Sequence, residues 1–159
     1  MKLYCYVDAS FSGLWKHEDD KDTVCVNSSI WYVMTLGGCP LHWVSNLHTE
    51  IYLSILEAEY IALSQAMRDL LPFIKLLQEV GTKLNMEFAS LTIMHSTLFD
   101  DNNGALGLVT SPRKTPRMRH IAVKYHFFRE HVSEVKGIMI QRMESKEHNT
   151  DVFTNVLPA

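Results

Sequence analysis

The hydrophobic pattern of the chain changes at residues 53–64, which read LSILEAEYIALS. From residue 54 to about residue 80, apolar side chains recur at the spacing of a helix, at positions 56, 63, 66, 67, 70, 74 and 77. This spacing predicts an amphipathic helix. Ser54 and Glu57 fit a capping box at its start, and Pro72 is expected to kink or split it.

Segments with strand character lie on both sides of this helix. Apolar runs predict strands at residues 3–7, 30–36, 41–44, 91–99 and 138–143, with a turn at Gly37 and Gly38. Further helices are expected at about 103–109, at about 117–134, where Ile121, Tyr125, Phe128 and Val132 would form one apolar face, and from residue 149 onward. The order β-β-β-α-β-α-α-β-α predicts one α/β domain with a mixed sheet.

The composition excludes several classes of protein. With 159 residues, 47% of them hydrophobic, the chain is long and apolar enough to bury a core, so a disordered chain is excluded. Its three cysteines (Cys5, Cys25 and Cys39) form no C-x-x-C pair. A disulfide framework or a cysteine zinc site is therefore not expected, and a reducing compartment is. No apolar run approaches the roughly 18 residues of a membrane span.

The charge is distributed unevenly along the chain. The formal net charge of −3 at first argues against nucleic-acid binding. Residues 112–142, however, hold eight basic and two acidic side chains, a net charge of +6, which leaves −9 on the remainder. This division is typical of a protein that binds a polyanion at one place and cations at another, although a solvated loop and helix face would give the same pattern.

Carboxylates stand at the ends of three predicted elements. Asp8 closes the first strand, Asp101 follows the strand at 91–99, and Asp151 lies in the first turn of the last helix. Each has a structural explanation when taken alone. Asp8 would serve as a turn former, Asp101 as a helix N-cap, and Asp151 as a partner of the helix dipole.

Glu57 and Glu59 are separated by helix geometry. Glu57 is expected on the polar face, with Ser64, Gln65 and Arg68. Glu59 follows the apolar stripe, because it lies three, four, seven and eleven positions from Leu56, Leu63, Ala66 and Leu70. We therefore expect Glu59 to face the interior, where a carboxylate needs a cation or hydrogen-bond donors to compensate its burial. The alternative is that Glu59 lies at the solvent-exposed margin of the apolar stripe.

Carboxylates from a strand, a helix and a strand end can converge above one edge of a sheet. A site built only of oxygen ligands favours Mg²⁺ or Mn²⁺ over zinc. In a two-metal site, such ions activate a water molecule and stabilise the leaving oxygen of a phosphodiester. Spacing along the chain does not show this convergence, which depends on the fold.

Four segments, in order, carry a family resemblance. They are residues 53–64, DNNGA at 101–105, RMRHIAVKYHFFRE at 117–130 and TDVFTNVLP at 150–158. Together they resemble the motifs of the ribonuclease H domain in copia-type LTR retrotransposon polyproteins, which accompanies a reverse transcriptase. The resemblance implies the ribonuclease H-like α/β fold, with a mixed five-stranded sheet flanked by helices, in a single domain over residues 1–159.

The resemblance also implies an activity and a site. The activity is metal-dependent endonucleolytic hydrolysis of the RNA strand in RNA–DNA hybrids during reverse transcription. The family's metal-binding catalytic carboxylates map onto Asp8, Glu59, Asp101 and Asp151, which would hold two Mg²⁺ ions, with Mn²⁺ as a possible substitute. The expected partners are the hybrid and the reverse transcriptase domain of the same polyprotein, without a membrane. The expected location is intracellular, in the cytoplasm within a virus-like particle or in the nucleus.

Further residues receive roles by the same resemblance. Candidates for phosphate contacts are Arg117, Arg119, His120, Lys124 and Arg129, because recognition of A-form-like hybrids uses backbone and 2′-OH contacts. The alternative is that some of these side chains lie on the far side of their helix and make no phosphate contact. His148, three residues before Asp151, is a candidate for proton transfer and product release, and an exposed loop histidine is the alternative.

The chain also departs from the family pattern. It reads DASF at residues 8–11, where D-A-D-W is usual, its loop before residue 30 keeps little of the family's T-G-Y stretch, and Asn155 stands where lysine is usual. Loops expected to touch substrate have therefore drifted. The alternative function is a catalytically silent nucleic-acid-binding or scaffolding module, a decayed copy of the same domain.

Overall fold

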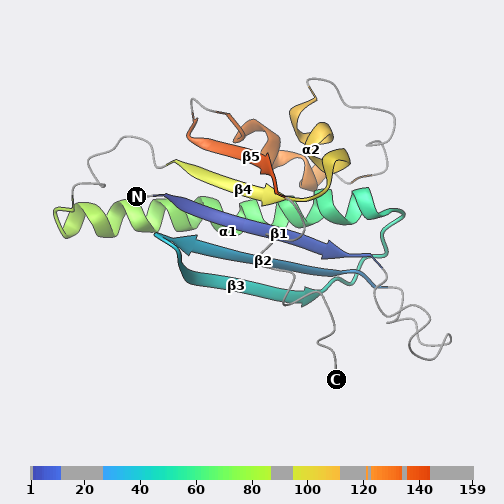
Figure 1. The fold of residues 1–159 in the computed structure, drawn as a ribbon, viewed down its shortest axis with the longest axis horizontal. Helices are drawn as coiled ribbons and strands as arrows, with labels where there is room; N and C mark the ends of the chain where they lie inside the picture. The colour runs from blue at the N-terminus through green and yellow to red at the C-terminus, as the bar shows by residue number, and fades with distance from the viewer. Residues whose placement is uncertain are drawn as a thin grey trace.

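The computed structural model of the chain describes residues 2–11, 27–86, 95–111, 121, 123–133 and 136–143. These residues form a five-stranded sheet in the order β3-β2-β1-β4-β5 (Figure 1). The strands are β1 (Leu3–Ser10), β2 (Ser29–Leu36), β3 (Cys39–Leu47), β4 (Ser96–Asp100) and β5 (Ile138–Arg142). β2 is antiparallel to both β1 and β3, whereas β4 is parallel to both β1 and β5. The predicted mixed five-stranded sheet is confirmed.

The turn between β2 and β3 is the predicted glycine turn. Gly37 and Gly38 have φ angles of 60° and 85°, and Leu36 pairs with Cys39 directly across them. A two-residue hairpin loop with positive φ at both positions matches the right-handed twist of the strands, and glycine adopts this conformation without steric cost. β3 therefore begins earlier than the predicted 41–44 and also ends later.

One long helix covers one face of the sheet. α1 (Ile55–Lys83) lies behind the strands in Figure 1 and packs against β1 and β2. The predicted apolar stripe is buried at Leu63, Ala66, Met67 and Leu70. The helix continues through Pro72, so the predicted split does not occur. Pro72 and Arg68 are both exposed, so water can reach the Arg68 carbonyl that proline leaves without a donor.

The start of α1 is capped as predicted, with one difference. The Ser54 hydroxyl accepts a hydrogen bond from the Glu57 N–H at 3.2 Å. The Glu57 carboxylate accepts the N–H of Leu53, at 2.7 Å, the residue before the cap. This bond folds Glu57 back under the helix start, where it is buried rather than on the predicted polar face; Ser64 is buried as well.

α2 (Asn103–Thr110) follows β4 after a two-residue break and packs against α1. The Asn102 side chain caps it, accepting from the N–H groups of Gly104 at 2.9 Å and Ala105 at 3.1 Å. A Cβ atom on Gly104 would lie 2.8 Å from Leu56 Cδ1. Glycine at this position therefore permits a close approach of α2 to the first turn of α1.

The predicted helix at 117–134 is replaced, in its described part, by two 3₁₀ helices. They are η4 (Val123–Tyr125) and η5 (Phe127–Glu130). Tyr125 of η4 and Phe128 of η5 are both buried in the core. The predicted burial of this apolar face is right, whereas the predicted helix type is wrong.

Two other predicted elements lie wholly or partly outside the described residues. β4 begins at Ser96, and residues 91–94 of the strand expected at 91–99 belong to the undescribed part, as does the helix expected from residue 149. Among the helices within the described ranges, none is long and apolar enough to cross a membrane.

Candidate metal centre

Three of the predicted carboxylates come together at one edge of the sheet. One carboxylate oxygen from each of Asp8, Glu59 and Asp101 lies within 4.8 Å of the other two. Asp8 belongs to β1, Glu59 to the second turn of α1, and Asp101 directly follows β4. The structure thus brings together residues that are far apart in sequence.

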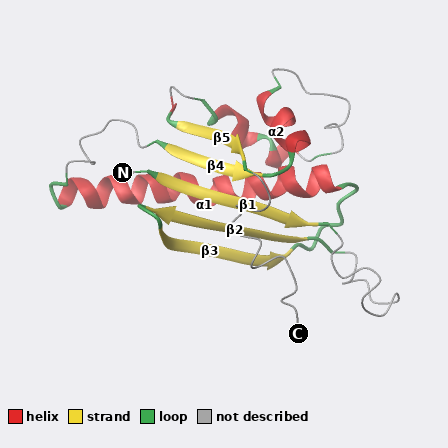
Figure 2. Ribbon diagram, in the orientation of Figure 1, coloured by secondary structure: helices red, strands yellow, loops and turns green. Residues whose placement is uncertain are grey.

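The parallel pairing of β1 and β4 accounts for two of these positions. The arrowheads of both strands point the same way in Figure 2, and Tyr6 is the register partner of Phe99. Their rings stack with centroids 5.2 Å apart, so both side chains lie on one face. Asp8 and Asp101 each lie two residues further on, which brings them level at the carboxyl ends of the strands.

Glu59 reaches the same place from the helix. Its side chain is only 4% exposed, as its position along the apolar stripe predicted. The Ala9 N–H donates to its carboxylate, while Oε2 has no hydrogen-bond partner among the described residues. Burial raises the pKa of Glu59 strongly, and the charges of Asp100, Asp8 and Asp101 raise it further.

Asp100 is a fourth carboxylate in this region that sequence reasoning missed. It is fully buried, its Oδ1 accepts the Asn102 N–H at 2.6 Å, and its Oδ2 has no partner among the described residues. Burial raises the pKa of Asp100, the Asn102 N–H opposes this rise, and the charges of Asp101 and Asp8 add to it. Alternation along β4 could have found it, because Asp100 shares a strand face with the fully buried Leu98.

The structure also tests the simpler explanations for Asp8 and Asp101. Asp8 lies inside β1, where its register partner is Trp31, so it does not form a turn. The N-cap of α2 is Asn102 and not Asp101. Neither structural role accounts for these two carboxylates at the strand ends.

The donor set fits a divalent metal ion. It consists only of carboxylate oxygens, which suits Mg²⁺ or Mn²⁺. Two of these oxygens, Glu59 Oε2 and Asp100 Oδ2, are buried without a hydrogen-bond partner in the described part of the chain. Buried carboxylates in this state are costly unless a cation or a proton compensates them.

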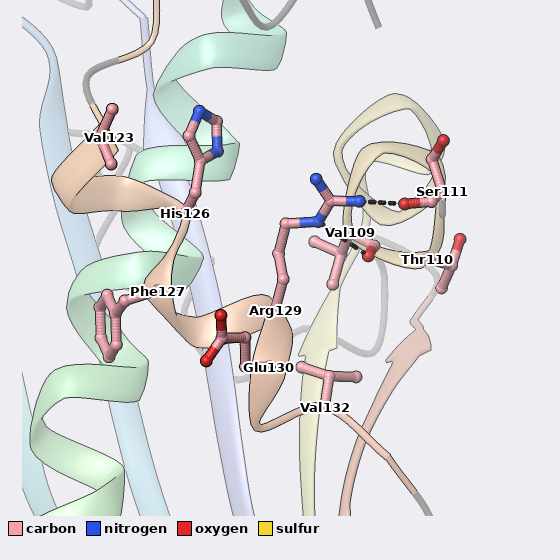
Figure 3. Close-up of a pocket in the computed structure, with 9 residues that line it drawn as sticks. All are labelled: Val109, Thr110, Ser111, Val123, His126, Phe127, Arg129, Glu130 and Val132. Atoms are coloured by element: carbon pink, nitrogen blue, oxygen red, sulfur yellow. Dashed lines mark hydrogen bonds between the residues drawn. The ribbon is translucent and has the colours of Figure 1, made fainter. Parts of the chain in front are cut away.

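The remaining predicted site residues are divided between described and undescribed parts. Lys124 donates to the Glu50 carboxylate with Nζ and Oε1 2.6 Å apart. Arg129 donates to the carbonyls of Val109 and Ser111 at the end of α2, as Figure 3 shows. Predicted residues that lie outside the described part are Arg117, Arg119, His120, His148 and Asp151.

The hollow drawn in Figure 3 is a separate feature. It has a volume of about 760 Å³, lies beside α2, η4 and η5, and its lining includes Thr110, His126 and Arg129. None of the three converging carboxylates lines it. The candidate site is therefore the carboxylate cluster at the strand ends, and not this hollow.

Comparison with curated proteins identifies relatives along almost the entire chain. It is 28% identical over 153 residues to the retrovirus-related Pol polyprotein from transposon TNT 1-94 of Nicotiana tabacum, with 96% of this chain covered. It is 28% and 29% identical, over 157 residues each, to the Pol polyproteins from transposons RE1 and RE2 of Arabidopsis thaliana, with 99% covered. The chain spans about a tenth of the length of these relatives. No family model matches it.

Comparison with solved structures identifies the fold. A ribonuclease H1 isolated from compost by a metagenomic approach aligns with a TM-score of 0.60 and 19% identity, over 96% of this chain and 91% of that one. The structure of LC11-RNase H1 in complex with an RNA/DNA hybrid aligns with a TM-score of 0.55 and 17% identity, over 92% and 88%. The N-terminal RNase H domain of a Mycobacterium tuberculosis protein aligns with a TM-score of 0.55 and 11% identity, over 95% of this chain and 88% of that one. The chain is therefore a ribonuclease H-fold relative of plant retrotransposon Pol polyproteins, which confirms the resemblance carried by its sequence motifs.

Proposed function

We propose that the chain is a metal-dependent ribonuclease H that hydrolyses the RNA strand of RNA–DNA hybrids as part of a reverse-transcribing polyprotein. The observation that carries this proposal is the convergence of Asp8, Glu59 and Asp101 at the carboxyl ends of two parallel strands. A fold shared with ribonucleases H would not by itself supply this chemistry, since one fold serves many functions.

The three carboxylates would hold divalent metal ions, Mg²⁺ or Mn²⁺. When bound, such ions lower the pKa of a water nucleophile and stabilise charge on the leaving oxygen of a phosphodiester. Asp8 and Asp101, each partly exposed, present oxygens at the surface, where a phosphate of the substrate can approach. Glu59 lies on α1 and is buried, so packing and the Ala9 N–H fix its orientation. Asp151 and His148 complete the proposed set from outside the described residues.

The substrate and partners are also part of the proposal. One structure with this fold, LC11-RNase H1, is described in complex with an RNA/DNA hybrid. The relatives of the chain are Pol polyproteins, ten times longer than the matched region, so we propose that a reverse transcriptase domain of the same polyprotein delivers the hybrid. Phosphate contacts by Lys124 and Arg129, with Arg117, Arg119 and His120, belong to the same proposal.

A cleavage assay with matched variants tests this function. The purified chain is incubated with an end-labelled RNA–DNA hybrid and Mg²⁺ or Mn²⁺, beside Asp8→Asn, Asp101→Asn and the exposed-surface control Glu79→Gln. Cleavage of the RNA strand by the wild type and E79Q alone, leaving 5′-phosphate and 3′-hydroxyl ends, is expected. Double-stranded DNA and single-stranded RNA serve as substrates that should stay intact.

The other outcomes are equally informative. Binding of the hybrid without cleavage, in the presence of either metal, would favour the catalytically silent binding module. Cleavage that persists in D8N and D101N would show that a contaminant or another site is responsible. Absence of both binding and cleavage in a folded chain would overturn the proposed function.

A further inference from the structure

Asp100 is a buried carboxylate whose surroundings satisfy only one of its oxygens. Its side chain is 0% exposed, and Oδ1 accepts the Asn102 N–H at 2.6 Å. Oδ2 has no hydrogen-bond partner within the described ranges. An aspartate needed only to form the turn after β4 would use Oδ1 and leave the other oxygen in water, so burial of Oδ2 calls for another explanation.

The position of Asp100 relates it to the metal centre. It directly precedes Asp101, and after burial, which is the larger cause, the charge of Asp100 raises the pKa of Glu59. Glu59 Oε2 is the second buried oxygen of this region that lacks a partner. Two buried carboxylate oxygens of this region are therefore unsatisfied within the described residues, a condition that a nearby cation would relieve.

Asp100 is not one of the three innermost carboxylates. The set of oxygens that lie within 4.8 Å of one another contains Asp8, Glu59 and Asp101, without Asp100. Asp100 lies behind this set, toward the interior, and its Oδ1 holds the backbone that presents Asp101. With all four ionised, these side chains carry four negative charges, the number that two divalent cations would neutralise.

We propose that Asp100 is a positioning residue of the metal centre, a second-layer carboxylate that raises the affinity of Asp8, Glu59 and Asp101 for divalent cations. It acts by charge on Glu59 and by its hydrogen bond on the loop that carries Asp101. This inference rests on the metal centre of the proposed function, and it assigns a role to a residue outside the family motif, which begins at Asp101. Outer-layer partners of metal ligands typically change metal affinity by 10- to 100-fold.

The test compares Mn²⁺ binding by the wild type, Asp100→Asn, Asp100→Ser and the exposed control Glu79→Gln. Asparagine keeps the Oδ1 acceptor and the size of the side chain while it removes the charge, and serine provides a smaller acceptor. Isothermal titration calorimetry gives the Mn²⁺ affinity, and thermal unfolding in EDTA shows whether each variant is folded.

We expect D100N and D100S to bind Mn²⁺ roughly 10- to 100-fold more weakly than the wild type and E79Q. We also expect D100N to unfold in EDTA at a temperature no lower than the wild type, because the asparagine retains the turn. Equal Mn²⁺ affinities for the wild type and D100N would overturn the proposal and leave Asp100 as a turn former. A wild type without measurable Mn²⁺ binding would overturn it as well.

The outcome is distinguishable from failure of the proposed function. A wild type that binds Mn²⁺ more tightly than D100N but leaves the hybrid intact would contradict the ribonuclease activity and support the role of Asp100. A wild type that cleaves the hybrid while D100N binds Mn²⁺ equally well would support the activity and overturn the role of Asp100.

Discussion

The Lys124 ammonium lies 2.6 Å from Glu50 Oε1, and this ion pair joins η4 to the loop before α1. The second oxygen of the same carboxylate accepts the Tyr125 hydroxyl at 2.9 Å. Glu50 thus accepts hydrogen bonds from two neighbouring residues of the segment 117–130, one of the four that carry the family resemblance. These bonds join this segment to the loop that leads into α1, the helix that carries Glu59.

Glu50→Ala and Glu50→Gln should differ in their effect on stability. Alanine removes the acceptor of the Tyr125 hydroxyl, and loss of such a hydrogen bond costs about 1 kcal/mol of unfolding free energy. Glutamine keeps an acceptor, and the ion pair it removes is half exposed, where such pairs contribute little. Urea denaturation of both variants measures the difference. An equal loss in E50Q and E50A would show that the charge, and not the hydrogen bond, stabilises this contact.

The same carboxylate should make stability depend on pH at the acid end. The hydrogen bond from Lys124 lowers the pKa of Glu50 below 4.5, with the Tyr125 hydroxyl as a further cause. A group with a depressed folded-state pKa stabilises the fold above its unfolded pKa and loses this contribution as the pH falls through the folded pKa. The wild type should therefore lose more stability than E50Q below pH 4.5. Urea midpoints between pH 3 and pH 6 measure this, and parallel curves for the two proteins would contradict it.

Arg129 should be required for stability through its geometry as well as its charge. Its guanidinium donates to the carbonyl of Val109, in the last turn of α2, and to that of Ser111, the C-cap residue of α2. Arg129→Lys keeps the charge but cannot reproduce the planar fork, so we expect both Arg129→Lys and Arg129→Ala to lose about 1–3 kcal/mol of unfolding free energy. Urea denaturation measures both.

The same pair of variants tests the proposed phosphate contact of Arg129. Hybrid affinity is measured for R129K and R129A under conditions where both are folded. A lysine variant that is as stable as the wild type and binds the hybrid equally well would contradict the structural role and favour a phosphate contact.

Divalent metal should stabilise the wild type and not variants of the carboxylate cluster. A ligand present at 100 times its dissociation constant stabilises the fold by about 2.7 kcal/mol. The melting temperature of the wild type should therefore rise when Mn²⁺ or Mg²⁺ replaces EDTA, whereas Glu59→Gln and Asp8→Asn should respond much less. Ca²⁺ and a monovalent salt of equal ionic strength control for screening. An equal rise in melting temperature in all variants would show that the metal binds at another site.

Part of this site could be predicted from the sequence, because helix periodicity alone places Glu59 on the buried face. The convergence of Asp8 with Asp101 could not, since it depends on β1 pairing in parallel with β4 across 85 intervening residues of chain. Glu57 was misplaced because its carboxylate folds back onto the Leu53 N–H, a local bond that periodicity ignores. Asp100 was overlooked beside Asp101, although strand alternation distinguishes the two faces.

For the segment 123–130, the sequence predicts burial but not the type of helix. Apolar residues three apart, such as Tyr125 and Phe128, share a face in an α-helix and in a 3₁₀ helix, so their burial follows from the sequence while the helix type does not. We attribute the helix type of this segment to long-range contacts. The Tyr60 hydroxyl lies 2.8 Å from His126 Nδ1, and Glu50 holds Lys124 and Tyr125.

The close approach of α2 to α1 at Gly104 should couple two positions far apart in sequence. A Cβ atom on Gly104 would lie 2.8 Å from Leu56 Cδ1 and 3.1 Å from the Asn102 Oδ1 that caps α2. Gly104→Val should therefore cost about 1–3 kcal/mol of unfolding free energy through overpacking. Leu56→Ala removes the atom that valine meets, so the double variant should lose less than the two single losses combined, with a coupling of at least about 0.5 kcal/mol. Urea denaturation of the four proteins measures this cycle. Strict additivity would show that the two helices do not meet at this glycine.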